Sequence, residues 1–346
     1  MADAIGKRYN NSMSFSKPLL LVSAAALSLT AQQPKGFPQP APAREVTITE
    51  IPGVIAAGAK WTMVWQGNET ADGMVGTDDG GILFAQEQTN RINKLDKNGK
   101  FSAYLTTPHG PGAVTNGPKG RLLAVERTCT DPGGHMGIKP DQCKEATDVA
   151  ELKPARKVLA DNFEGKSLGR VNDLVADKKG GAYFTSGGAY YMRPDGKVIS
   201  IGENLRTNGI NLSPDQKTLY ITNGPVIMAF DVQPDGSVKN QREFGKLEGG
   251  GNGDGMAVDA DGRIYDTTNV GIQVLAPDGK YLGLIPTPRA SITVTFSGDG
   301  KKTLYVGCMG ALDANGQEVR TAPGVRNVAM TVYTIPMISH GFKGPK

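Results

Sequence analysis

Gly180-Gly181-Ala182-Tyr183-Phe184 is one of six copies of a short motif in which a polar turn leads directly into an alternating apolar strand. The other copies are Gly80-Gly81-Ile82-Leu83-Phe84, Gly120-Arg121-Leu122-Leu123-Ala124, Gln216-Lys217-Thr218-Leu219-Tyr220, Gly262-Arg263-Ile264-Tyr265 and Gly300-Lys301-Lys302-Thr303-Leu304-Tyr305. The six copies begin 40, 60, 36, 46 and 38 residues apart. A repeat of about 40 residues with strand and turn chemistry is typical of propeller blades, so six copies predict an all-β, six-bladed β-propeller.

A second series of turns lies between these motifs and predicts four strands in each blade. Its members are Lys97-Asn98-Gly99, Pro194-Asp195-Gly196, Pro234-Asp235-Gly236, Pro277-Asp278-Gly279 and Ala314-Asn315-Gly316. Asp-Gly and Asn-Gly supply the positive φ that tight hairpins need. A propeller must close its ring to avoid unpaired edges, so we expect alternating residues 46–51 and 328–335 to share a blade. A pair of β-sandwiches, the alternative fold, fits this double-turn period poorly.

Composition and charge limit the partners of the chain. It has 346 residues and a formal net charge of +4, and its basic residues are scattered through turns. A nucleic-acid interface would need clustered positive charge, so we expect none, and a small-molecule ligand is favoured. We expect a monomer or a small homo-oligomer.

The first residues are typical of an export signal rather than of a folded domain. Basic residues precede an apolar run that is too short to span a bilayer, and small residues follow it. We predict a signal peptide at 1–31, a flexible leader at 32–44 and the propeller at 45–346, with an insertion at about 128–155. The protein would then be periplasmic or secreted, with no membrane association once the signal is removed; an unprocessed, disordered leader is the alternative. In such a compartment Cys129 and Cys143 are candidates for a disulfide within the insertion, with two reduced thiols as the alternative.

Four polar residues recur at the start of the predicted inner strands. They are Asp72, Asn172, Asn208 and Asp254, each just before a short apolar run. If the blades superpose, two carboxylates and two amide oxygens converge on the ring axis and form a hard, oxygen-only shell suited to Ca²⁺, or to Mg²⁺ or Mn²⁺ with added waters. Each residue alone is equally well explained as a turn former, because Asn and Asp before Gly tolerate turns. Their common offset favours a shared metal site.

At these residues the chain resembles the SMP-30/gluconolactonase/LRE-like family of six-bladed propellers. The resemblance covers roughly residues 72–305. Its most specific stretches are Ala160-Asp161-Asn162-Phe163-Glu164-Gly165-Lys166-Ser167-Leu168, Arg170-Val171-Asn172-Asp173, Thr207-Asn208-Gly209-Ile210-Asn211-Leu212-Ser213-Pro214-Asp215 and Gly253-Asp254-Gly255-Met256-Ala257-Val258-Asp259. It implies one divalent metal, with Ca²⁺ expected and Mg²⁺, Mn²⁺ or Zn²⁺ as alternatives. It also implies that Asn208 and Asp254 are metal ligands, that Asn172 is a ligand or substrate contact, and that Arg170 contacts substrate.

The chain departs from the family pattern at two places. Asp72 stands where the family usually has Glu, and Glu69 is a substitute if the loop folds differently. The phrase Val125-Glu126-Arg127 replaces a Cys-Glu-His-like phrase and would alter the pocket wall.

The resulting functional prediction is a metal-dependent lactonase that acts on a cyclic ester, such as a sugar lactone. Asp254 would position or deprotonate the attacking water, Arg170 and Asn172 would hold substrate oxygens, and Tyr190 would line the pocket unless it is a packed aromatic. The alternatives are a non-catalytic ligand-binding propeller, and an aryl ester or phosphotriester hydrolase using the same metal pocket.

Overall fold

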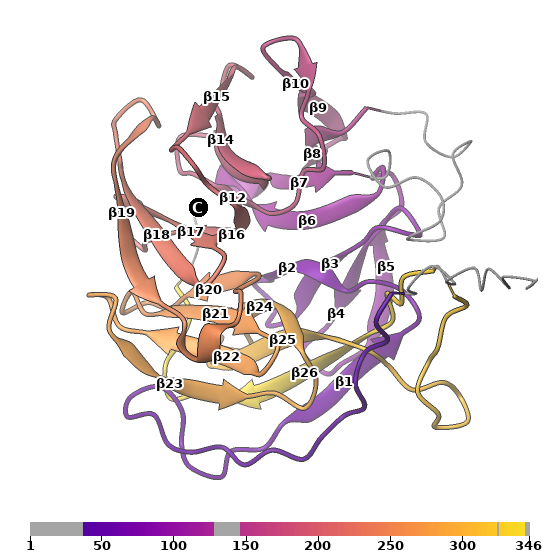
Figure 1. The fold of residues 1–346 in the computed structure, drawn as a ribbon. Coiled ribbons are helices and arrows are strands. Elements are labelled where there is room, and N and C mark those ends of the chain that lie inside the picture. Colours follow the sequence, from indigo (N-terminus) through magenta and orange to yellow (C-terminus); the bar gives the residue numbers. More distant parts are fainter. Residues whose placement is uncertain (1–36, 128–145, 324, 343–346) are drawn as a thin grey trace, which may run out of the picture. The chain divides into compact units, whose positions relative to one another are not determined.

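The computed structural model describes residues 37–127, 146–323 and 325–342. These residues form six four-stranded antiparallel sheets arranged in a ring (Figure 1). The predicted six-bladed β-propeller is therefore confirmed. The described part of the chain contains strands and short 3-10 turns but no helix long and apolar enough to cross a membrane.

Each blade is one sheet, with its first-named strand nearest the ring axis. Blades 1 to 3 are β2 (Asp72–Gly76), β3 (Ile82–Gln86), β4 (Arg91–Leu95) and β5 (Phe101–Leu105); β6 (Pro111–Asn116), β7 (Leu122–Glu126), β8 (Asp148–Lys153) and β9 (Lys157–Ala160); and β12 (Leu174–Ala176), β13 (Ala182–Ser186), β14 (Gly188–Met192) and β15 (Val198–Ile201). Blades 4 to 6 are β16 (Thr207–Leu212), β17 (Thr218–Asn223), β18 (Val226–Val232) and β19 (Val238–Lys246); β20 (Met256–Val258), β21 (Ile264–Thr268), β22 (Gly271–Leu275) and β23 (Tyr281–Pro286); and β24 (Ser291–Ser297), β25 (Thr303–Met309), β26 (Met330–Pro336) and β1 (Thr62–Gly67). A small hairpin, β10 (Asn162–Phe163) with β11 (Lys166–Ser167), lies between blades 2 and 3 in the sequence.

The repeated motif of the sequence is the second strand of every blade. These strands are strongly buried; in β3, for example, all five residues from Ile82 to Gln86 are shielded from solvent. The core consists of six apolar clusters, each of which joins two adjacent blades. Apolar side chains on both faces of a blade can thus be buried, which explains why the strands read as nearly continuous apolar runs.

The second series of turns joins the third and fourth strands in blades 1, 3, 4 and 5, as predicted. Gly196, Gly236 and Gly279 have φ values of +85°, +86° and +86° at these turns, a conformation that glycine adopts without strain. Ala314-Asn315-Gly316 differs from the others, because it lies in the long loop between β25 and β26. In blade 6 the fourth strand comes from the N-terminal part of the chain, so no hairpin is needed there.

The ring is closed by β1 and β26, and the predicted N-terminal partner is therefore wrong. Strand β1 (Thr62–Gly67) pairs with β26, whereas residues 46–51 form no sheet strand. Instead, Ile48 and Ile51 are buried in the apolar cluster between blades 5 and 6. Alternation in residues 46–51 thus reflects one buried face and not a place in a sheet. The C-terminal half of the prediction, residues 328–335, overlaps β26 and is confirmed.

Several expectations concern residues that lie outside the described parts. These are the signal peptide at 1–31, the first part of the leader, and the Cys129–Cys143 disulfide. Of the expected insertion at 128–155, Asp148–Lys153 forms the third strand of blade 2, so that part belongs to the propeller. Cys308 is completely buried in β25, and burial raises the pKa of its thiol to about 12, which fits a packing role and not that of a nucleophile.

Candidate active site

The four polar residues singled out in the sequence occupy equivalent places in four blades. In each of these blades the last residue of the inner strand pairs with the first or second residue of the next strand. These cross-strand pairs are Gly76 with Ile82, Ala176 with Ala182, Leu212 with Leu219 and Val258 with Ile264. Asp72, Asn172, Asn208 and Asp254 each lie four positions before the inner member of such a pair. The shared offset seen in the sequence is therefore a shared structural position at the start of the inner strands, which surround the middle of the ring in Figure 1.

All four side chains line one pocket of about 360 Å³. Asn172 donates from Nδ2 to Oδ1 of Asn208 over 2.6 Å, which places two amides from neighbouring blades in direct contact. Asp72 and Asp254 line the same pocket, with Arg127 and Arg170 beside them. The convergence that the sequence predicted from separate blades is thus present in the geometry.

The backbone fixes Asp254 tightly. The backbone N–H of Asp254 donates to the carbonyl of Thr267 over 2.9 Å. The backbone carbonyl of Asp254 accepts from the hydroxyl of Thr222 over 3.0 Å. Gly253 has to be glycine, because a Cβ there would lie 2.2 Å from Oδ1 of Asp266. Within the described residues, no side chain or backbone donor is bonded to the Asp254 carboxylate. Asp254 is therefore held rigidly while its carboxylate faces the pocket.

The carboxyl groups around the axis repel one another. The pKa of Asp254 is raised well above its ordinary value by burial and by the negative charges of Asp72, Asp266 and Asp173. Burial raises the pKa of Asp173 to about 7 and that of Asp266 to about 8. The largest cause for all three groups is burial, which disfavours their charged forms.

Arg127, which follows β7 of blade 2, and Glu87, which follows β3 of blade 1, complete the site. The guanidinium of Arg127 donates from Nη2 to Oδ2 of Asp72 over 3.0 Å, from Nε to Oε2 of Glu87 over 2.9 Å, and from Nη1 to Oδ1 of Asn172 over 2.8 Å. Glu87 follows β3 and is buried. The sequence does not predict its role, because it lies in a loop with no repeated motif around it.

The remaining predicted site residues fall in different places. Arg170 lines the pocket, and Oε2 of Glu87 lies 3.4 Å from its guanidinium. Tyr190 is not among the pocket's lining residues; its ring stacks on Phe184 at 5.3 Å and meets Phe163 edge-on at 5.4 Å, so it is the packed aromatic of the two alternatives. Glu69 is likewise outside the lining; burial raises its pKa, and Arg91 partly offsets this.

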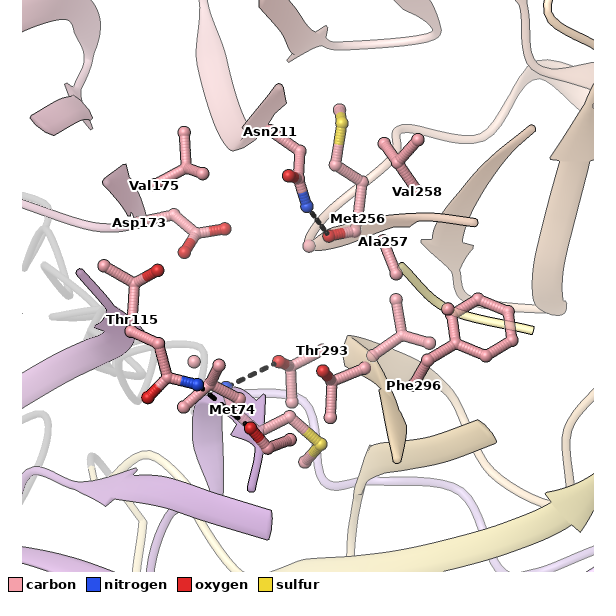
Figure 2. A pocket seen from close by; sticks show the side chains of 18 of the residues that line it. Met74, Thr115, Asp173, Val175, Asn211, Met256, Ala257, Val258, Thr293 and Phe296 are labelled. Carbon is pink, nitrogen blue, oxygen red and sulfur yellow. Dashed lines mark hydrogen bonds between the residues drawn. The ribbon is translucent and has the colours of Figure 1, made fainter. Parts of the chain in front are cut away.

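A second pocket continues along the ring axis beyond these residues (Figure 2). All six inner strands contribute to its lining, with side chains that include Met74, Thr115, Asn211 and Phe296. Asp173 points into it, immediately after Asn172 in the chain. Mixed apolar and hydroxyl groups here contrast with the charged first pocket, where all four predicted ligand residues lie. The first pocket is therefore the candidate active site.

Comparison with known proteins finds a similar family. Residues 143–309 match the family model described as the SMP-30/gluconolactonase/LRE-like region. The chain is also 27% identical to a gluconolactonase from Zymomonas mobilis over 285 residues, which cover 73% of this chain and 77% of that protein. The chain is therefore similar to the SMP-30/gluconolactonase/LRE-like family over residues 143–309.

A further relative and two solved structures are also similar to this chain, and the solved structures share its fold. A lactonase drp35 from Staphylococcus haemolyticus is 23% identical over 223 residues, or 59% of this chain and 65% of that protein. A solved gluconolactonase from Xanthomonas campestris superposes with a TM-score of 0.66 at 19% identity, covering 88% of this chain and 99% of that one. A calcium-binding regucalcin from Agrobacterium tumefaciens superposes with a TM-score of 0.61 at 16% identity, over 82% and 95% of the two chains.

The donor set of this pocket fits a hard divalent cation. Two carboxylates and two side-chain amides line one pocket, and oxygen ligands of these kinds suit a hard divalent cation. Within the described residues no group of three or more His, Cys, Asp or Glu side chains is arranged to hold a metal. Any cation in the pocket would therefore depend on the amide oxygens of Asn172 and Asn208 as well as on the acids.

Proposed function

We propose that the protein is a lactonase that hydrolyses a cyclic ester, with a sugar lactone as the substrate class. The observation that carries the proposal is the meeting of Asp72, Asn172, Asn208 and Asp254 in one pocket of a chain that is similar to this family. The names of the relatives, a gluconolactonase and a lactonase, support the same reaction class. Fold alone would not specify the chemistry, so the proposal rests on the site.

One divalent cation would be held by Asp254, Asn208, Asn172 and Asp72, with Ca²⁺ expected from the all-oxygen donor set and Mg²⁺, Mn²⁺ or Zn²⁺ as alternatives. When bound, such a cation supplies positive charge that polarises a carbonyl and stabilises the oxyanion formed on hydrolysis.

The residues of the chain supply the remaining functions. The carboxylate of Asp254 faces the pocket without a donor from the described residues, so it is free to accept a proton from a water molecule. The hydroxide oxygen adds to the lactone carbonyl carbon, the ring C–O bond breaks, and the proton passes to the leaving alkoxide to give the hydroxy acid. Arg170 and Asn172 are placed at the pocket wall to hold substrate oxygens.

A substrate panel tests this function. Purified protein is assayed with δ-lactones, γ-lactones, aryl esters and an organophosphate triester, each with and without a chelator and with added Ca²⁺. We expect hydrolysis of δ-lactones that the chelator abolishes and Ca²⁺ restores. Preference for an aryl ester or a triester would assign the pocket to those substrates, and no turnover of any substrate with metal present would indicate a ligand-binding propeller.

A further inference from the structure

The position in blade 2 that corresponds to the four polar residues carries no side chain. Asn116 pairs with Leu122 in the register that Gly76 has with Ile82, so Gly112 corresponds to Asp72. A Cβ on Gly112 would lie 2.6 Å from Nη1 and 2.7 Å from Cζ of Arg127. The guanidinium of Arg127, which directly follows strand β7 of the same blade, therefore fills the space that a side chain at position 112 would occupy.

Arg127 is built into the site and is not a surface residue that folds over it. Its side chain is 4% exposed, and its acceptors include Asp72, Glu87 and Asn172. Arginine keeps its charge at any pH at which a protein is folded. The pocket thus contains a permanent cation that is held by carboxylate and amide oxygens.

Two of the four residues expected to hold a metal are engaged by this guanidinium. Oδ2 of Asp72 accepts from Arg127, and Oδ1 of the same carboxylate accepts from the backbone N–H of Gly73 over 2.9 Å. Oδ1 of Asn172 also accepts from Arg127. A divalent cation would have to displace these contacts and would be repelled by the positive charge next to them.

We propose that Arg127 is a resident cation of the axial site and that it competes with a divalent metal for Asp72 and Asn172. Gly112 is the residue that makes room for it. The two departures of this chain from the family pattern, Asp72 in place of Glu and Arg127 in place of His, are then linked, because the guanidinium bonds the shortened acid. The inference deepens the proposed function and rests on its metal component: Arg127 limits metal affinity by engaging Asp72 and Asn172, two of the four predicted ligands.

Titration calorimetry with Ca²⁺ and with Mn²⁺ tests the competition on the full chain. Gly112→Ala keeps every charge but places a methyl group against the guanidinium, whereas Arg127→Met with Glu87→Gln removes the buried pair together. We expect each variant to bind Ca²⁺ at least about tenfold more tightly than the wild type, because the competing guanidinium is displaced in the first variant and absent from the second. Gly251→Ala is the matched control, since φ of Gly251 is −82° and no atom lies within 4 Å of its added Cβ.

Unchanged or weaker Ca²⁺ affinity in both variants would overturn the proposal. The absence of Ca²⁺ binding in the wild type, both variants and the control would overturn it as well. If one variant fails to fold, the other decides the question by the same measurement. The calorimetry does not depend on turnover. A failure of lactone hydrolysis would therefore count against the proposed function, and the Ca²⁺ affinities would still test the role of Arg127.

Discussion

Replacing Asp254 with Asn is expected to lower kcat/KM for lactone hydrolysis by about 10²- to 10⁴-fold, the range for loss of a general base. The same substitution is expected to raise the Tm of the metal-free protein. Asp254 is held at the centre of a group of carboxyls, and burial together with Asp72, Asp266 and Asp173 raises its pKa. A raised pKa means that the ionised form is disfavoured in the folded state, so a neutral isostere removes repulsion that the fold otherwise tolerates.

The opposite signs of the two effects separate a functional role from a structural one. Activity is measured with the preferred lactone at saturating Ca²⁺, and the Tm is measured with chelator present. Asp278→Asn, in the exposed turn between β22 and β23, is the control and is expected to leave both values unchanged. An Asp254→Asn protein that retains full activity, or one that melts well below the wild type, would show that this carboxylate does not have the role proposed for it.

Substituting Glu87 with Ala is expected to lower the free energy of unfolding by about 3–5 kcal/mol, because it leaves a buried guanidinium without its main carboxylate. Arg127 is 4% exposed and Glu87 is fully buried, so water cannot replace the lost contact between Nε and Oε2 at 2.9 Å. Arg170 would lose a carboxylate contact as well. Glu87→Gln, which keeps an acceptor, is expected to fall between the wild type and the alanine variant.

Urea unfolding monitored by fluorescence gives these values. The control is Glu243→Ala, whose partner Lys246 is 71% exposed and whose ion pair should contribute at most about 0.5 kcal/mol. A loss below about 1 kcal/mol for Glu87→Ala would mean that the Arg127 guanidinium finds other partners or reaches solvent, contrary to its burial.

The blade pattern can be read from the sequence because it is local. A turn followed by a second strand repeats in every blade, and the polar residues four positions before the end of each inner strand repeat with it. Asp72, Asn172, Asn208 and Asp254 can therefore be assigned to one site from the repeat alone. Periodicity carries that information directly, since equivalent positions in a propeller face the same axis.

What the sequence could not supply was contact between elements. Residues 46–51 and 62–67 both precede the first blade, and alternation alone does not tell a strand that pairs with β26 from a segment that covers a cluster. Glu87 has no repeat to mark it. Arg127 follows β7, and its guanidinium packs against Gly112, a contact that only the three-dimensional structure reveals.

Diffraction data from crystals soaked in Mn²⁺, collected for its anomalous signal, test most directly whether oxygens of separate blades surround one cation. We expect a single strong peak in the pocket, about 2.1–2.4 Å from a carboxylate oxygen of Asp254 and from Oδ1 of Asn208. A map with peaks only on the outer surface, or none at millimolar Mn²⁺, would contradict the metal site and the hydrolytic chemistry proposed for it.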